Sequence, residues 1–484
     1  MTKQEAAIKY ITENYLDYNR LRHDIISDKL QVRLDLEEAR GEEHPKTPRA
    51  FSGTPLRLEV KGREYWRELS KHDINSIVCH AAQEYDQNIT SREVLTALQS
   101  DLIPDVHPLR EYIQSLKPYT NDQPDWIDMV ARQVRVRNNN EENVCKEDNI
   151  NNLCARPTLA LAKDDMFPLS QPLSNVGEAE ELSMLSSEKK HPTPSADALW
   201  RGCFKKWFVA MVASWMNDEV VNHQVLVLIG RQGIYKTTWL EHLIPPHLRA
   251  YACKLANSAE LNKDDRLRIA EFGLISLDEI DSMNTRELNQ LKSVITATDV
   301  NERAAYGYTK ERRIRLASFC ASGNRRDFLT DITGNRRWLP FEVESIQNPF
   351  FTTLPYERMY AQAWALANDP TFCYWFELDE IEVLEEHNKH FRDESNEEQL
   401  LAVYFAVPAE GAEHTKFLTT AEISEKLISA GNIKRPMSLS RLGMLLGQQG
   451  FIASRHGTPP RRGWMVYERG SEEINAERRI FAKQ

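Results

Sequence analysis

The sequence lacks the features of exported, membrane-spanning and zinc-binding proteins. No stretch of its 484 residues approaches the ~20 consecutive apolar residues that cross a bilayer, and MTKQEAAIKY at the start has no apolar segment like that of a signal peptide. The seven cysteines are scattered, without a C-x-x-C pair or a Cys/His set at zinc spacing. We therefore expect a cytoplasmic protein with reduced thiols and no membrane partner.

The chain also lacks net positive charge. It has 61 Lys and Arg against 72 Asp and Glu, a net charge of −11, which excludes a protein that coats nucleic acid with its whole surface. Contact with DNA would have to come from local basic segments. The length suggests about three domains, and a hydrophobic fraction of 41% is sufficient for a sizeable α/β core.

The most informative segment is VLVLIGRQGIYKTT, residues 225 to 238. An apolar, β-favouring run ends at Gly230, and Lys236 and Thr237 follow at the spacing of the G-x-x-x-x-G-K-[ST] phosphate-binding loop. Tyr235 replaces the usual glycine before the lysine, which restricts φ and leaves the rate of hydrolysis open. The alternative is an ordinary strand-to-helix turn. The predicted nucleotide-binding residues are Gly230, Arg231, Gln232, Gly233, Ile234, Tyr235, Lys236, Thr237 and Thr238.

A second strand is predicted at residues 272 to 277, FGLISL, and it ends at Asp278 and Glu279. Ligands of open α/β sheets bind at the carboxyl ends of parallel strands. We expect Asp278 and Thr237 to serve a magnesium ion and Glu279 to polarise the attacking water, with Asp281 as a weaker candidate. The alternative is a solvated helix start, where acids are favoured.

A third strand, IRLASFCASGN, is predicted from Ile314 to Asn324, and a TGNRRW turn follows it. This turn places Arg336 and Arg337 side by side. Planar guanidinium groups suit a γ-phosphate, and an arginine from a neighbouring subunit can stabilise its developing charge. The alternative is a pair of surface arginines on a turn.

In this order, the phosphate loop, the acid-ended strand, the Asn-ended strand and TGNRRW resemble the virulence-associated protein E family. That family is similar to superfamily 3 helicases, which are ring-forming P-loop ATPases of phages, plasmids and integrated elements. The resemblance covers roughly residues 85 to 395 and is most specific in GRQGIYKTTWL and DITGNRRW. It implies ATP and Mg²⁺ as cofactors, Asp278 and Glu279 as the Walker B pair, Asn324 as the sensor, and Arg336 or Arg337 as the finger to a neighbouring subunit.

Two basic segments are candidates for DNA contact. Residues 303 to 337 carry nine Lys and Arg against three acids. By position, this segment resembles the hairpin that points into the channel of superfamily 3 rings and grips the DNA backbone. We expect its cations to neutralise phosphates and Tyr306 and Tyr308 to stack on bases. The alternative is a charged hairpin at a subunit contact. The candidate cations are Arg303, Lys310, Arg312, Arg313 and Arg315.

The second segment, residues 431 to 468, holds six Lys and Arg and one acid. A helix at 418 to 431, a second helix with four inward leucines, and two strands around a Pro/Gly turn predict a winged helix. Its second helix, with Arg441, would lie in a major groove, and Arg461 and Arg462 on the wing would contact the backbone. The alternative is a protein-contact module.

The predicted fold class is α/β, with a P-loop ATPase core of the AAA+-like, superfamily 3 type, a helical N-terminal region and a C-terminal winged helix. The helical region is interrupted by a hairpin at 55 to 67. The expected domains are 1–120, a helical collar or DNA-contacting domain; 121–197, a helix and a polar disordered insert; 198–345, the ATPase core; 346–398, a helical lid; and 399–484, the winged helix.

We therefore expect an ATP-dependent DNA helicase or translocase that acts in replication of a phage or mobile element. It would hydrolyse Mg-ATP between the subunits of a homo-oligomeric ring, expected as a hexamer, on single-stranded or forked DNA. Residues 1 to 120 are too short for the primase-like domain of many relatives, so a primase would be a separate protein. The alternative is an ATP-binding switch that regulates replication or phage interference with little or no unwinding; a P-loop kinase is a weaker interpretation.

Overall fold

The computed structural model describes residues 1–34, 65–137, 194–255, 263–302, 311–329, 335–392, 396–408, 415–431, 433, 436–456 and 458–481. Residues 138 to 193 of the predicted insert (138 to 197) and most of the predicted hairpin at 55 to 67 lie outside these residues, while the last two residues of the predicted insert begin helix α8 (Ala196–Met216). The chain forms two compact units. They are Met1–Arg326 with Arg336–Asn388, and Asp327–Asn335 with Lys389–Gln484.

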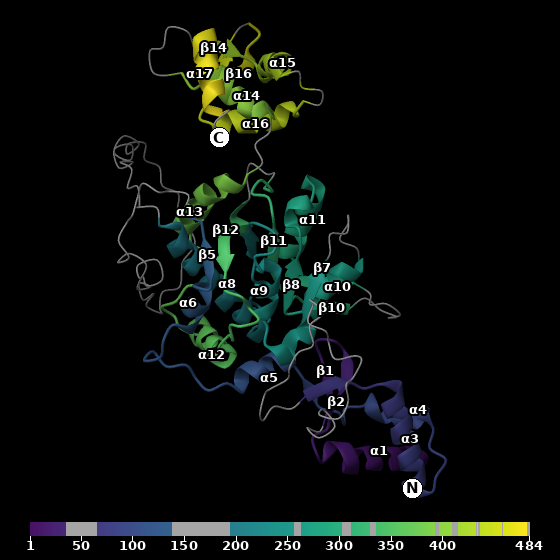
Figure 1. The fold of residues 1–484 in the computed structure, drawn as a ribbon. Coiled ribbons are helices and arrows are strands. Elements are labelled where there is room, and N and C mark those ends of the chain that lie inside the picture. Colours follow the sequence, from purple (N-terminus) through teal and green to yellow (C-terminus); the bar gives the residue numbers. More distant parts are fainter. Residues whose placement is uncertain are drawn as a thin grey trace, which may run out of the picture. The chain divides into compact units, whose positions relative to one another are not determined.

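The first unit is built on a six-stranded sheet with the strand order β5-β12-β6-β11-β8-β7, of which Figure 1 labels β5, β12, β11, β8 and β7. All neighbours are parallel except β5, which is antiparallel to β12. β6, β8 and β11 are buried at every position, as in parallel sheets that are covered on both faces. The bounds are β5 Val134–Val136, β6 Val225–Ile229, β7 Ala252–Leu255, β8 Leu274–Leu277, β11 Ser318–Gly323 and β12 Trp338–Ile346.

Helices and one hairpin surround this sheet. The hairpin pairs β9 (Asp299–Glu302) with β10 (Glu311–Ile314), so Ile314, the first residue of the predicted strand 314–324, ends β10, and the predicted strand itself begins at Ser318 as β11. The helices are α5 Pro108–Gln114, α6 Trp126–Ala131, α8 Ala196–Met216, α9 Lys236–His242, α10 Lys263–Glu271, α11 Thr285–Thr296, α12 Tyr356–Ala367 and α13 Leu378–Asn388, with 3₁₀ turns η4 Pro246–Tyr251, η5 Ile280–Ser282 and η6 Asn335–Arg337. Among the described helices none has both the length and the apolar character to traverse a bilayer.

Helix α8 lies in the core of the first unit. It is apolar on nearly all sides, which is typical of a helix enclosed by other elements. Its tryptophans also satisfy their polar atoms: Trp200 donates its indole N–H to Ala131 O at 2.9 Å, and Trp207 donates to Phe319 O at 3.1 Å. Trp215 donates to Gly273 O at 3.1 Å. These three tryptophans therefore hold α8 in place through directional hydrogen bonds as well as through the apolar surface that their rings bury.

The N-terminal region contains a sheet that the sequence analysis missed. Its strands are ordered β3-β2-β1-β4 and pack with α1 (Lys3–Ile11), the π-helix η1 (Thr12–Leu16), α3 (Lys71–Tyr85) and α4 (Ser91–Leu98). The prediction of helix is wrong around 21–34, where KLQVRL places leucine and valine at every second position. Strand β3 overlaps the last residues of the predicted hairpin at 55 to 67. The bounds are β1 Leu21–Asp24, β2 Lys29–Leu34, β3 Tyr65–Glu68 and β4 Asp105–Val106.

The second unit contains the two helices and the hairpin expected near the C-terminus. Leu442, Leu445 and Leu446 are buried against Ile423 and Leu427, but the predicted inward Leu439 is exposed. Strand β16 pairs with β13, β14 and β15, and an additional helix α17 follows it. The bounds are η7 Lys389–Phe391, α14 Asn396–Tyr404, β13 Phe405–Ala406, β14 Thr415–Leu418, α15 Thr420–Gly431, α16 Leu439–Gln448, β15 Ile452–His456, β16 Arg461–Glu468 and α17 Ser471–Phe481.

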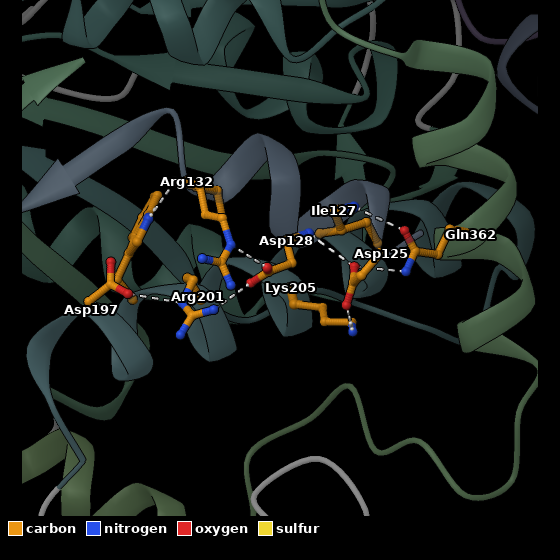
Figure 2. Close-up of polar contacts among 10 residues, drawn as sticks. Asp125, Ile127, Asp128, Arg132, Asp197, Arg201, Lys205 and Gln362 are labelled. Atoms are coloured by element: carbon orange, nitrogen blue, oxygen red, sulfur yellow. Dashed lines mark hydrogen bonds and ion pairs between the residues drawn. The ribbon is translucent and has the colours of Figure 1, made fainter. Parts of the chain in front are cut away.

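A polar network fastens α6 to α8 and α12 (Figure 2). Asp125 caps α6 and accepts hydrogen bonds from Lys205 Nζ at 2.5 Å and Gln362 Nε2 at 2.8 Å. Gln362 Oε1 in turn accepts from Ile127 N at 2.9 Å. Burial raises the pKa of Asp125, but the Lys205 ammonium and the hydrogen bonds outweigh it and lower the pKa below its ordinary value. The network holds α6, and therefore the edge strand β5 that follows, against the core.

Replacing Asp125 with alanine should lower the free energy of unfolding by about 1–3 kcal/mol, because it removes a helix cap and leaves two donors without their acceptor. Urea denaturation followed by tryptophan fluorescence measures the change. Asp122→Ala, an exposed acid in the same loop, is the matched control and should stay within about 0.5 kcal/mol of the parent. Equal effects of the two substitutions would contradict the network's role.

His107 makes stability depend on pH. It caps α5, and its Nδ1 accepts from Arg110 N at 3.3 Å. Burial, together with the Arg110 cation, lowers the pKa of His107 to about 4. Between this pKa and the unfolded value of about 6.5, the unfolded chain binds the extra proton, so stability falls as pH falls.

Urea titrations of the parent and of His107→Asn, which keeps a capping side chain, should therefore diverge with pH. We expect the parent to lose about 1–2 kcal/mol more than the variant between pH 7 and pH 5. Parallel losses in the two proteins would show that His107 does not carry this dependence.

Candidate functional site

Residues that the sequence analysis assigned to one site lie at one edge of the main sheet. Strand β11 pairs with both β6 and β8, with Gly323 opposite Ile229 and Ala321 opposite Leu277. Because these strands are parallel, their carboxyl ends share the same edge (Figure 1). The loop after β6, the acids after β8 and Asn324 after β11 are therefore neighbours.

The loop between β6 and α9 has the backbone that its glycines allow. A Cβ at Gly230 would lie 2.7 Å from Val343 O, so no larger residue fits there without a shift of the backbone. Gly233 has φ +85°, in the left-handed region that favours glycine. Tyr235, at the position of the missing motif glycine, adopts φ 68° and ψ 19° and still directs the chain into α9. This left-handed conformation costs a non-glycine residue about 1–2 kcal/mol.

Lys236 places its ammonium group inside this loop. The side chain belongs to a residue only 7% exposed, and its Nζ donates to Gly230 O at 2.8 Å and to Arg231 O at 2.7 Å. It also lies 3.4 Å from Asn324 Oδ1. Burial lowers the pKa of Lys236, and the nearby Asp281 and Asp278 oppose that change. The loop thus presents a concentrated positive charge at the sheet edge.

The Asp278 carboxylate contacts side chains from three other elements, α9, β11 and β7. Its Oδ1 is 3.3 Å from Thr237 Oγ1 and accepts from Ser322 Oγ at 2.8 Å, while Thr237 and Ser322 are 2.8 Å apart. Its Oδ2 pairs with Lys254 Nζ at 2.5 Å. Burial raises the pKa of Asp278, but the bonds from Lys254, Ser322 and Thr237 give a net decrease. The carboxylate is therefore ionised at neutral pH and oriented toward Thr237.

Ser322 and Lys254 were not among the predicted site residues. Ser322 is a polar residue in the otherwise apolar end of β11, two positions before Asn324. This local pattern could have marked it as a candidate site residue. Lys254 has no such signal. It reaches Asp278 because β7 pairs in parallel with β8, with Lys254 opposite Ser276.

The other two acids after β8 differ in surroundings. Glu279 is exposed at the rim of the sheet edge and has a left-handed φ of 54°. The Asp281 carboxylate is largely enclosed and accepts from the backbone N–H groups of Asn324 at 3.1 Å and Arg325 at 3.2 Å. Asp281 therefore holds the turn after β11, and with it the side chain of Asn324, beside the loop.

Arg336 and Arg337 lie at the opposite edge of the sheet. They form η6 directly before β12, and Trp338 at the start of β12 pairs with Val225 at the start of β6. The loop lies after the other end of β6. Within one chain these arginines do not belong to the site around Lys236, and a role for them at a ligand there would require a neighbouring subunit.

The basic hairpin β9–β10 contains only part of the predicted cationic surface. Arg312 is exposed and pairs with Asp299 at 2.9 Å, and Arg313 is half-buried, 3.6 Å from Glu271. Arg315 corrects the prediction: it is 2% exposed and donates to Ala317 O at 3.0 Å and Asn222 O at 2.8 Å, so it stabilises the core and cannot contact DNA. The predicted Arg303, Tyr306, Tyr308 and Lys310 lie outside the described residues.

In the second unit, exposed basic residues gather at the end of the β15–β16 hairpin. Arg462 lies opposite Arg455, and Arg461 lies opposite His456. Like charges directly opposite each other on a sheet are destabilising. Arg441 is half-buried at the start of α16. Arg455 and His456 were not predicted, because only cross-strand register places them beside the two arginines.

The first unit thus defines a mixed α/β protein with a parallel sheet and a cluster of charged side chains at the carboxyl edge. Residues 190–396 match the model of the virulence-associated protein E-like domain. This part of the chain, which contains the loop, the acids and Asn324, is therefore similar to that family, and the predicted resemblance is confirmed.

Solved structures with some likeness to the chain share little sequence with it. The apo structure of the NrS-1 C terminal region (305-718) has 12% identity and a TM-score of 0.39, over 96% of this chain and 100% of that one. An A form apo structure of the same region has 11% identity and a TM-score of 0.34, over 93% and 96%. No curated protein matches the chain.

Proposed function

We propose that this protein is a magnesium-dependent ATPase that moves along or unwinds DNA during replication of a phage or mobile element. In this proposal the first unit is a P-loop core of the AAA+-like, superfamily 3 type and the second unit includes a winged helix. The observation that carries it is the meeting of the Lys236 ammonium, the Thr237 hydroxyl and the Asp278 carboxylate at one sheet edge.

The residues at this edge fit a nucleotide with a magnesium ion. Mg²⁺ prefers oxygen ligands and usually takes one or two from protein and the rest from phosphate and water. Thr237 Oγ1 and Asp278 Oδ1 are such oxygens, 3.3 Å apart. Among the described residues no cluster of three His, Cys, Asp or Glu could hold a metal by itself.

Each side chain then has a defined task. Lys236 exchanges the carbonyls of Gly230 and Arg231 for phosphate oxygens, which compensates the cost of its partial burial. Asp278 and Thr237 would hold the metal, and Lys254 keeps Asp278 ionised and oriented toward the site. Bound Mg-ATP supplies the phosphoanhydride bond that water cleaves. Glu279 at the rim accepts a proton from that water, and Asn324 Oδ1 orients it.

A ring accounts for the position of the arginine pair. Head-to-tail contacts between identical subunits join two different surfaces and form rings when the rotation between subunits closes. Arg336 and Arg337 at one edge of the sheet and the loop at the other are two such surfaces. In a ring, expected as a hexamer, they would stabilise the charge that develops on the γ-phosphate of the neighbouring subunit.

Steady-state hydrolysis of Mg-ATP, with and without single-stranded DNA, tests this function. We expect turnover that DNA stimulates. Lys236→Ala should abolish detectable turnover and weaken ATP binding while leaving the unfolding transition in place, because only the charge in the loop is removed. Lys9→Ala, at an exposed lysine on α1, is the control and should match the parent. Full turnover in Lys236→Ala would refute the site.

The second candidate function is a nucleotide switch that binds ATP, assembles and regulates replication or phage interference with little unwinding. The left-handed conformation of Tyr235 favours it, since a side chain stands where the motif has a glycine. The same assay separates the two functions: tight Mg-ATP binding with negligible turnover in the presence of DNA supports the switch.

DNA contact is assigned to the end of the β15–β16 hairpin. The double substitution Arg461→Ala/Arg462→Ala should weaken binding of single-stranded or forked DNA and lower the slope of log K against log salt by about 1.4–1.8, since each lost phosphate contact removes about 0.7–0.9. Fluorescence anisotropy over a salt series measures both. Lys416→Ala/Lys426→Ala is the matched control, because both lysines pair with Glu468. An unchanged slope in the arginine variant would place the DNA surface elsewhere.

A further inference from the structure

A group of aromatic side chains lies directly beside the loop that holds Lys236. We call Tyr235, Phe350 and Phe351 the aromatic platform. The Tyr235 and Phe350 rings meet edge to face, with centroids 6.3 Å apart and an interplanar angle of 82°. Phe350 is 49% exposed and Phe351 is 88% exposed. Two consecutive phenylalanines are thus displayed to solvent next to a buried cation.

The platform is an ordered structure that one asparagine organises. Asn348 Oδ1 accepts from Phe350 N at 3.0 Å, and its main-chain oxygen accepts from Phe351 N at 3.1 Å. Its amide Nδ2 is also 3.4 Å from the Tyr235 hydroxyl. The His242 ring meets Phe350 at 5.7 Å from the α9 side. The turn after β12 is therefore tied to the loop and to α9, and the exposure of its phenylalanines is held in place.

The charge of Lys236 and the aromatic rings of the platform together indicate the chemical class of the ligand. A molecule that contacts both Lys236 and the platform needs an anionic part and a flat apolar part, joined over the short distance from Lys236 to the adjacent Tyr235. A nucleotide has this form: its phosphates suit the ammonium, and its base has a π-face that stacks on aromatic rings whatever its hydrogen-bonding edge. A bare phosphate chain would use only the first part.

We propose that the aromatic platform is the base-binding subsite of the nucleotide whose phosphates contact Lys236. The inference rests on the proposed function and adds the part of the ligand that gives the site its preference for nucleoside triphosphates over inorganic polyphosphate. This subsite also explains why a tyrosine stands at position 235. The residue lacks the backbone freedom of glycine, but its ring forms one wall of the subsite for the base.

Calorimetric titration of the full chain with Mg-ATP and with magnesium tripolyphosphate tests the subsite. Phe351→Ala should weaken Mg-ATP binding by about 10-fold, or about 1.4 kcal/mol, and leave tripolyphosphate affinity within about 2-fold of the parent. Phe350→Ala should act in the same direction, and Phe351→Trp should retain the parent affinity because it keeps a stacking face. Tyr18→Ala, at an exposed tyrosine outside the platform, is the aromatic control and should change neither ligand.

The outcomes separate the subsite from the function on which it rests. Parent-like Mg-ATP binding in both phenylalanine variants, with loss in Lys236→Ala, overturns the subsite and leaves the ATPase proposal standing. Equal weakening of both ligands by Phe351→Ala also overturns it, since the ring would then only support the loop. A changed oligomeric state with unchanged ATP affinity assigns the platform to a subunit contact and overturns it. Failure of the parent to bind either ligand removes both proposals.

Discussion

The pairing of β11 with β6 on one side and β8 on the other is the constraint on which the candidate site depends. Each strand by itself brings only part of the site to its carboxyl end. Parallel pairing aligns those ends, so that the Lys236 ammonium, the Asp278 carboxylate and the Asn324 amide meet across three strands. The buried faces of the same strands supply the apolar core that holds this alignment.

Tyr235 shows how a local strain is maintained at this site. A left-handed tyrosine opposes the conformational preference of the residue, yet its neighbours hold it: the Asn348 amide meets its hydroxyl and Phe350 meets its ring. Strained backbone persists where surrounding contacts determine it, and such positions cluster at functional sites. The turn after β12 and the loop after β6 therefore form one local structure, although they are far apart in the sequence.

Much of the site could be predicted because its signals are local. The loop spacing, the strand that ends at Asp278 and the strand that ends near Asn324 each occupy a short run of residues. Arg315, Lys254 and the N-terminal strands could not be placed in this way. Arg315 stands in the basic run ERRIR and looks like its exposed neighbours, but the chain turns inward after β10 and encloses its guanidinium group among main-chain carbonyls.

The sequence by itself determined the parallel α/β class of the core and the order along the chain of the strands that carry the site. It also determined the identity of the cation and the acid at their ends. These features were predictable because apolar periodicity and motif spacing each involve only a few neighbouring residues. Only the tertiary structure decided which side chains complete the site. Lys254, Ser322 and Phe350 come to it through strand register and the packing of a distant turn, and those contacts depend on residues that no local pattern connects.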